Sequence, residues 1–248
     1  MTAEDRLLGG RVRLVQPKTG LKAGLDAVML AAAVPALPGQ IVLDAGCGAG
    51  AVFLCLMARV EGLQVVALER DPELAALALR NAELNGFAAR VRVILGDIAT
   101  EALPLVNHAC ANPPFWPDGT APPAALRAGA THAGATRLDV WVRAMTAPVR
   151  AGGSVTLVLP ATRFSEAGAA LRGAGCGDVG LYPLWPRAGA PARRVLISAK
   201  RGGRGPDRVA SGLVLHENGG WSAAAETVLR DAAPLPGHAP PHDPLRRA

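Results

Sequence analysis

The sequence predicts one α/β domain in which helices cover both faces of a mostly parallel sheet. Strand-like and helix-like segments alternate from residue 41 onward, which is typical of doubly wound sheets. Half of the 248 residues are hydrophobic, which suffices for a core of this size. Seven apolar runs predict seven strands: Ile41–Ala45, Gln64–Leu68, Val91–Leu95, Leu105–Ala111, Ser154–Leu159, Val179–Leu184 and Arg194–Ala199.

The segments between these runs predict the helices. Those inside the main domain, residues 41–233, are Ala51–Val60, Pro72–Leu84, Leu138–Val149 before Gly152-Gly153, and Thr162–Arg172. Residues 1–40 are expected to pack on this domain as a lead-in, with a short basic amphipathic start and a helix over Leu25–Val34. A basic glycine loop at 202–208, a short strand at Leu213–His216 and a short helix at Ala223–Arg230 follow. The Pro-rich tail, 234–248, is expected to be disordered.

Composition narrows the function classes. The formal charge of +6 and the pI of about 9.8 favour a polyanionic partner, although an ordinary basic protein is the alternative. Cys47, Cys55, Cys110 and Cys176 form no CxxC pair and lack a nearby histidine at metal spacing, so no metal is expected. We expect a cytoplasmic protein without membrane contact. The cysteines are expected to be reduced, the N-terminus shows no signal pattern, and no apolar run approaches ~20 residues.

The first unusual motif is L-D-A-G-C-G-A-G, which follows the first strand of the main domain. Gly46 and Gly48 allow a tight turn and close approach of a ligand to the backbone. The G-x-G-x-G spacing differs from the G-x-G-x-x-G of dinucleotide sites. Asp44 would repel a pyrophosphate but suits a cationic ligand. S-adenosylmethionine, which carries a sulfonium and an ammonium, meets this requirement.

Two acids follow the next two strands. Glu69 ends its strand a little over twenty residues past the glycines, where an acid commonly accepts from a ribose hydroxyl pair. Asp97 can accept from the exocyclic amine of the cofactor adenine. Its alternative role is to cap a turn or a helix.

Asn112-Pro113-Pro114-Phe115 is the most specific motif. Two successive prolines fix the backbone and remove two donors. The Asn112 amide oxygen and the Pro113 carbonyl are then free to hold the hydrogens of a substrate –NH2 group, which aims the nitrogen lone pair at the methyl group. Phe115 offers a face on which a flipped base can stack. The alternative is a purely structural proline turn.

These motifs, in this order, resemble the class I Rossmann-like methyltransferases that carry N-P-P-[YF]. Gln16-Pro17, Gly20 and the run L-D-A-V-M-L from Leu25 are similar to the start of the bacterial tRNA(Val) adenine-N6 methyltransferase family. The resemblance covers roughly residues 41–159. It implies that Asp44, Gly46, Gly48, Glu69, Asp97 and Ile98 contact the cofactor and that Asn112 to Phe115 form the catalytic loop.

Further candidates concern the substrate. Asp26 is either a helix N-cap or, as the resemblance suggests, a residue at the border of the active site. Trp116 extends the stacking surface or anchors its loop, and His132 lies in the same long loop. Arg201 and Arg204, in a basic stretch with Arg193, Arg194, Lys200 and Arg208, are expected to contact RNA phosphates. The alternative for this stretch is a solvated, solubilising loop.

The function expected is S-adenosylmethionine-dependent N-methylation of a base in RNA, with adenine N6 in tRNA favoured. The alternatives of the same chemistry are rRNA guanine-N2 or adenine-N6 methylation and methylation of a protein glutamine. An RNA-binding module that keeps a cofactor pocket without activity is the alternative from a different class. The sequence does not indicate the oligomeric state.

Overall fold

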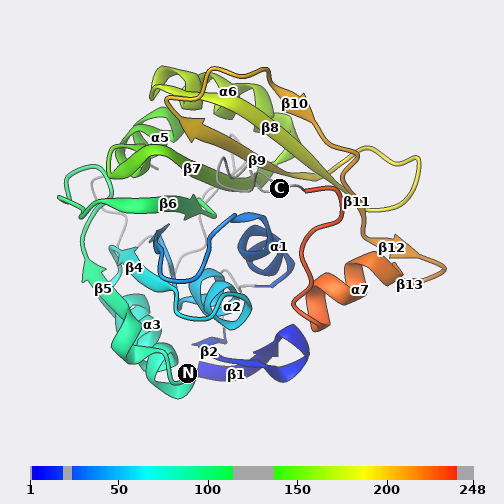
Figure 1. Cartoon of the computed structure of the whole chain (residues 1–248). Helices are drawn as coiled ribbons and strands as arrows, with labels where there is room; N and C mark the ends of the chain where they lie inside the picture. The colour runs from blue at the N-terminus through cyan, green and yellow to red at the C-terminus, as the bar shows by residue number, and fades with distance from the viewer. Residues whose placement is uncertain (1, 19–23, 114–136, 239–248) are drawn as a thin grey trace, which may run out of the picture.

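A mixed sheet crosses the centre of the structure, a computed structural model that describes residues 2–18, 24–113 and 137–238 (Figure 1). The described part of this sheet has nine strands. Eight follow the order β10 (Arg208–Val209), β8 (Cys176–Trp185), β9 (Arg194–Arg201), β7 (Val149–Pro160), β6 (Val106–Ala111), β3 (Ile41–Ala45), β4 (Gln64–Glu69) and β5 (Val91–Leu95), and β11 (Leu213–Val214) also pairs with β8. All seven predicted strands are present, which confirms the predicted fold class; β10 and β11 add short pieces at one side.

The strand directions create one functional edge. β5, β4, β3, β6 and β7 pair in parallel, so all five end on the same side, which we call the carboxyl edge. β9 runs antiparallel to both β7 and β8. It therefore begins at the carboxyl edge with Arg194, where β8 ends with Trp185. Crevices beyond the carboxyl ends of parallel strands are where ligands bind in such sheets.

Helices cover both faces of the sheet, as predicted. α1 (Leu25–Ala33), α2 (Ala51–Arg59), α3 (Pro72–Leu84) and α7 (Ala223–Arg230) pack on one face, and α5 (Leu138–Thr146) and α6 (Phe164–Gly173) on the other (Figure 1). Side chains of the buried strands alternate between the two cores: Val42 packs in the first and Leu43 in the second. Among the described residues, short 3-10 turns lie at Leu8–Gly10, Ala88–Arg90 and Ala161–Arg163.

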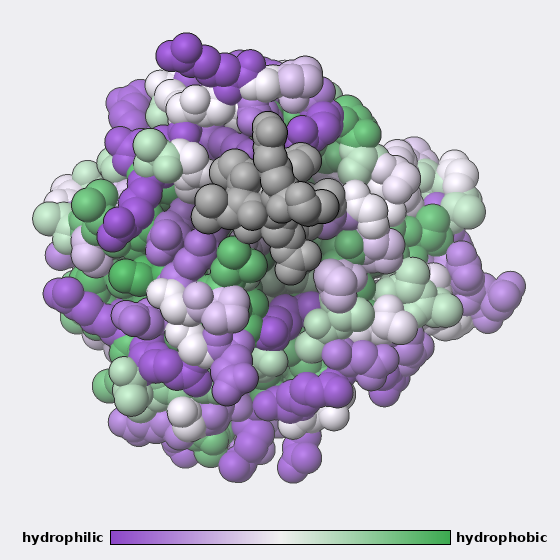
Figure 2. Space-filling view, in the orientation of Figure 1, coloured by the Kyte–Doolittle hydropathy of each residue, from purple (hydrophilic) through white to green (hydrophobic). Residues whose placement is uncertain are grey.

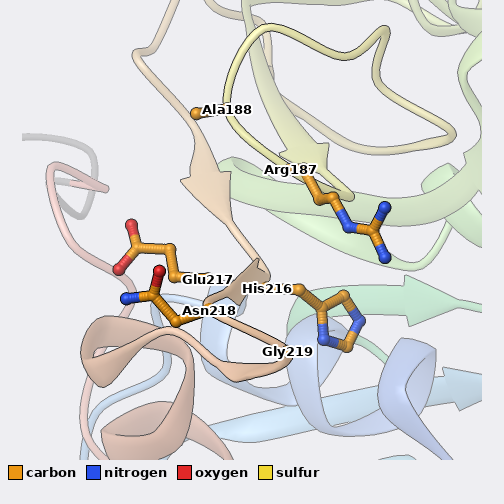
Figure 3. Close-up of a pocket in the computed structure, with 6 residues that line it drawn as sticks. All are labelled: Arg187, Ala188, His216, Glu217, Asn218 and Gly219. Atoms are coloured by element: carbon orange, nitrogen blue, oxygen red, sulfur yellow. The ribbon is translucent and has the colours of Figure 1, made fainter.

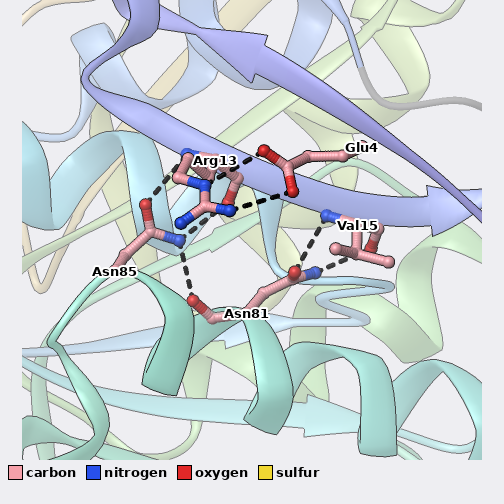
Figure 4. A network of polar contacts seen from close by, with 5 residues as sticks. All are labelled: Glu4, Arg13, Val15, Asn81 and Asn85. Carbon is pink, nitrogen blue, oxygen red and sulfur yellow. Dashed lines mark hydrogen bonds and ion pairs between the residues drawn. The ribbon is translucent and has the colours of Figure 1, made fainter.

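The lead-in contains a hairpin that the sequence analysis did not predict. β1 (Thr2–Leu7) pairs antiparallel with β2 (Val12–Pro17), and buried Val12 and Leu14 join the first core. β2 is also fixed to α3, because Asn81 and Asn85 each exchange two hydrogen bonds with a residue of β2 (Figure 4). The two asparagines are one helical turn apart and bind Val15 and Arg13, which are two residues apart on β2. Each asparagine side chain thus replaces the backbone groups that a neighbouring strand would offer.

The boundary between α5 and β7 differs from the prediction. α5 ends at Thr146, and β7 already begins at Val149, so Gly152-Gly153 lie inside a strand instead of ending a helix. The pairing of β6 with β7 shifts register between Val106 and His108, and a Cβ atom at Gly153 would collide with the carbonyl oxygen of Asn107. Glycine therefore permits this irregularity.

The start of the Pro-rich tail is packed rather than disordered. Leu235 is buried, Tyr182 donates to the Pro236 carbonyl at 2.8 Å, and His238 donates from Nε2 to the Ala33 carbonyl at 3.0 Å. The prediction of disorder is therefore wrong for residues 234–238. Residues 239–248 lie outside the described part. Within that part, no helix is long and apolar enough to cross a membrane.

Candidate active site

The register of the sheet brings the predicted site residues together. Ala45 of β3 pairs with both Leu68 of β4 and Ala111 of β6, so Gly46, Glu69 and Asn112 follow on three adjacent strands. Glu69 in turn pairs with Leu95 of β5, two residues before Asp97. Adjacent strands lie about 4.8 Å apart. Asp97, Glu69, Gly46 and Asn112 therefore succeed one another along the carboxyl edge.

The glycine turn after β3 is held in one conformation. The amides of Gly46 and Cys47 both donate to the Leu68 carbonyl, at 2.8 and 2.9 Å. Gly46 and Gly48 have φ angles of 69° and 57°, a region that disfavours other residues. A Cβ atom at Gly46 would lie 2.9 Å from the ring of Trp141, whereas a Cβ atom at Gly48 would meet nothing within 4 Å. Gly46 thus makes room for Trp141, and Gly48 borders open space.

Glu69 organises the turn from the neighbouring strand. One carboxylate oxygen accepts from the Gly48 amide at 2.8 Å, and the other accepts from the amides of Arg70 and Asp71 at 2.9 and 3.0 Å. Only 8% of the residue is exposed. A carboxylate has about four lone-pair sites, so acceptor capacity remains for a hydroxyl pair of a ligand.

Asp44 is a buried acid with spare capacity. Its Oδ2 accepts from the Phe53 amide at 3.2 Å in the first turn of α2, and this is its only hydrogen bond among the described residues. Burial raises the pKa of Asp44 to about 7, and the negative charge of Glu69 adds to the shift. A cation placed beside Asp44 would stabilise the ionised form.

Asn81 is a site residue that the sequence analysis missed. Its fully buried amide group donates to the Ala49 carbonyl in the glycine turn at 2.9 Å. It also accepts from the Val15 amide and donates to the Val15 carbonyl, each at 2.8 Å (Figure 4). One side chain thus joins the lead-in hairpin, α3 and the glycine turn. Its distance from any motif in the sequence concealed this role.

Asp97 and Ile98 follow β5. Asp97 is half-buried and its Oδ1 accepts from the Ala99 amide at 2.8 Å, while its backbone carbonyl accepts from Thr100 and Glu101. The turn-capping role therefore exists, and the second carboxylate oxygen accepts no hydrogen bond from the described residues. Ile98 is buried and packs in the second core.

The catalytic loop is described only at its start. Asn112 is exposed directly after β6, and Pro113 is buried behind it. The predictions for Pro114, Phe115, Trp116 and His132 concern residues outside the described part. The two described residues nevertheless locate the motif beside the glycine turn, because Ala111 pairs with Ala45.

Of the residues predicted to contact the substrate, Asp26 lies at the carboxyl edge of the sheet. Helix α1 begins at Leu25 with Gly24 as its N-cap, so Asp26 is not the cap; its Oδ2 accepts from Arg194 Nε at 3.0 Å. Arg194 pairs with Pro160 at the end of β7, which puts this ion pair at the carboxyl edge.

Arg201 and Arg204 do not join the site. Lys200 pairs with Ser154, so β9 ends at the edge opposite Asn112. Arg201 there donates to the backbone carbonyls of Ala147 and Val149, and Gly205 donates to the Asp178 carboxylate. The topology therefore puts these two arginines at the edge opposite the catalytic loop, and their contact with RNA phosphates stays a prediction.

The described residues fit S-adenosylmethionine. Asp44 and Glu69 supply acceptors for a cation and for hydroxyl groups. The indole nitrogen of Trp141, beside Gly46, is buried and has no acceptor among the described residues, so it can donate to a ligand carboxylate. The site thus offers carboxylate acceptors for the ammonium group of the cofactor and an N–H donor for its carboxylate.

Comparison with known proteins identifies the family. The model of the Methyltransferase small domain matches residues 22–136. A tRNA1(Val) (adenine(37)-N6)-methyltransferase of Dickeya chrysanthemi is 30% identical over 191 residues, 75% of each chain. The relative of that name in Actinobacillus succinogenes is 28% identical, over 76% of this chain and 80% of its own. For that of Tolumonas auensis, at 30% identity, the match spans only 62% of the relative's length.

Solved structures agree with the fold. A predicted O-methyltransferase of Agrobacterium tumefaciens superimposes with a TM-score of 0.69 at 28% identity, over 82% of this chain and 94% of its own. An S-adenosylmethionine-dependent O-methyltransferase of Thermotoga maritima has a TM-score of 0.55 at 18% identity and shares the fold. The predictions of a methyltransferase and of S-adenosylmethionine as its cofactor are confirmed. The chain belongs to the tRNA1(Val) (adenine(37)-N6)-methyltransferase family of class I S-adenosylmethionine-dependent enzymes.

Proposed function

We propose that this enzyme methylates the exocyclic N6 amine of an adenine in tRNA. The observation that carries the proposal is the register that puts Asn112 beside the glycine turn, on the strand next to β3. The names of the relatives support the nucleobase and the RNA. The net charge of +6 suits a polyanionic substrate.

The order of the groups along the carboxyl edge matches the order of groups in an extended S-adenosylmethionine. Asp97 on the β5 side would accept from the adenine amine, and Glu69 on β4 from the ribose hydroxyls. The turn at Gly46 and Gly48, with Asp44 behind it, would receive the amino-acid end. When bound, the cofactor would supply an electrophilic methyl group, and Asn112 would hold the substrate amine on the neighbouring strand end.

The catalytic residues act by holding the substrate amine. The Asn112 Oδ1 and the Pro113 carbonyl oxygen would each accept one hydrogen of the –NH2 group, so the nitrogen lone pair leaves conjugation with the ring and points at the methyl group. Pro114 has no N–H that competes for these acceptors. The amine nitrogen can release its proton to solvent after the bond has formed, so no strong general base is needed.

Identification of the methylated product tests the proposal. The enzyme would be incubated with labelled cofactor and, separately, with unmodified tRNA, rRNA and release-factor protein, and the labelled nucleosides would be separated after digestion. We expect N6-methyladenosine from tRNA. Label in N2-methylguanosine, in rRNA alone or in protein would overturn the proposed substrate, and no label in any arm would favour a non-catalytic module. The location that fits the proposal is the cytoplasm, where tRNA is present and the four buried cysteines stay reduced.

A further inference from the structure

A small hairpin stands apart from the main sheet near its outer side. β12 (His216–Glu217) and β13 (Gly220–Trp221) pair only with each other among the described strands. The hairpin follows β11, which pairs with Leu184 and Trp185 where β8 ends. It therefore protrudes on the carboxyl-edge side of β8 (Figure 1). Its tip is hydrophilic (Figure 2).

The hairpin is firmly attached at its base. The Leu215 amide donates to the Trp185 carbonyl at 2.7 Å, and the His216 amide donates to the Pro186 carbonyl at 3.1 Å. Ser222 closes the other side: it donates from its hydroxyl to the Val214 carbonyl and caps α7. These contacts fix His216 directly beside the loop that begins at Pro186.

The hairpin presents an aromatic surface beside a cation. The rings of His216 and Trp221 stack, with centroids 4.3 Å apart, and Trp221 stays 37% exposed. His216 Nδ1 donates to the Gly220 carbonyl at 3.3 Å, which orients the imidazole. A pocket of about 610 Å³ lies between the hairpin and Arg187. Arg187 and His216 extend to one side of it, whereas Glu217 and Asn218 extend to the other (Figure 3).

The loop that faces the hairpin carries only positive charges, while the hairpin contributes the acid Glu217 to the pocket lining. The loop between β8 and β9, residues 186–193, contains Arg187 and Arg193 and no acid. Arg187 is exposed and forms no ion pair with any described acid, and Arg193 is also exposed. A rigid stacking surface next to guanidinium groups is the combination by which proteins hold unstacked nucleotides, with bases on the aromatic face and phosphates on arginine.

We propose that Arg187, His216 and Trp221 form a docking site for single-stranded nucleotides that flank the target base in RNA. β11, which leads into the hairpin, is four strands from β6, so the hairpin begins on the order of 20 Å from Asn112 along the carboxyl edge. A few nucleotides span that distance. The inference rests on the proposed RNA substrate and adds a contact region to it that is distinct from the cofactor pocket and from Arg201 and Arg204 at the opposite edge.

The test compares Arg187→Ala and Trp221→Leu with wild-type enzyme and with Arg150→Ala, which removes the same charge from an exposed residue at the start of β7, at the opposite edge. Binding of a tRNA transcript would be measured by fluorescence anisotropy at several salt concentrations, and methylation by steady-state kinetics. We expect KM for tRNA to rise about tenfold in both site variants, with kcat and cofactor affinity unchanged. Arg187→Ala should also lower the slope of log affinity against log salt by about one. Trp221→Phe, which keeps a ring face, should restore most of the loss, and Arg150→Ala should resemble wild type.

The result that overturns the inference is wild-type RNA binding and wild-type KM in Arg187→Ala and in Trp221→Leu. Losses of equal size in Arg150→Ala would also overturn it, because they would indicate a general charge effect. Failure of the proposed function is a different result: wild-type enzyme would then methylate no tRNA. The exposed Arg187 keeps the test open even where Trp221→Leu impairs folding.

Discussion

Asp44 is an ionisable residue that is almost completely buried, with 1% of its surface exposed. Its carboxylate nevertheless accepts only one hydrogen bond from the described residues. Its pKa of about 7 means that roughly half of the free enzyme carries a proton there at neutral pH. A cationic ligand favours the ionised form. Cofactor binding and deprotonation of Asp44 are therefore linked.

This linkage predicts that cofactor affinity increases with pH through the region around 7. Because the raised pKa keeps Asp44 neutral below this region, a cation finds no opposite charge there, and the affinity should fall by up to about tenfold per pH unit. At pH 7 binding should release about half a proton, measurable by calorimetry in two buffers of different ionisation enthalpy. Asp44→Asn should bind weakly and without this pH dependence. A wild-type affinity that is flat from pH 6 to 8 would remove Asp44 from the cofactor site.

At the scale of elements, the glycine turn depends on a contact between segments far apart in sequence. The hairpin β1–β2 is bound to α3 through Asn81 and Asn85, but only Asn81 continues to the turn, at Ala49. The two asparagines therefore form a matched pair for experiment. Both hold β2, and one of them also holds the cofactor turn.

Asn81→Ala should lower cofactor affinity by about tenfold and destabilise the fold by about 1–3 kcal/mol, because it leaves buried backbone groups without partners. Asn85→Ala should destabilise the hairpin alone and leave cofactor affinity within about twofold. Calorimetric titration and urea unfolding of the two variants measure both quantities. Equal cofactor affinities in the two variants would mean that Asn81 stabilises the fold without positioning the turn.

The sequence predicted elements well where one signal dominates. Apolar runs closed by Gly46, Glu69 or Asn112 gave the strands and their functional ends, because burial on both faces makes such strands continuously hydrophobic. The hairpin escaped prediction because β1 (T-A-E-D-R-L) is an exposed, charged edge strand. Gly152-Gly153 were misinterpreted because glycine both ends helices and permits strand irregularities. Such ambiguity is resolved only by the neighbouring strand.

For the whole molecule, topology decides which charges act together. Arg194 and Arg201 are the two ends of β9, so they lie at opposite edges of the sheet, and the antiparallel direction of β9 puts Arg194 at the carboxyl edge. The sequence shows them as one basic stretch and gives no strand order. Conversely, Asp97, Glu69, Gly46 and Asn112 are dispersed over the chain but succeed one another at one edge. The sequence does indicate this gathering, because parallel strands share a carboxyl edge.

The central claim is that this edge is one site in which Asn112 holds the substrate amine while other strand ends hold the cofactor. Single-turnover methylation of tRNA by Asn112→Ala, with cofactor affinity measured on the same preparation, tests it most directly. We predict a rate about 10²-fold below wild type, as for loss of a positioned polar group, with cofactor affinity within about twofold. A near-normal rate would contradict the account, as would a loss of rate that saturating cofactor restores.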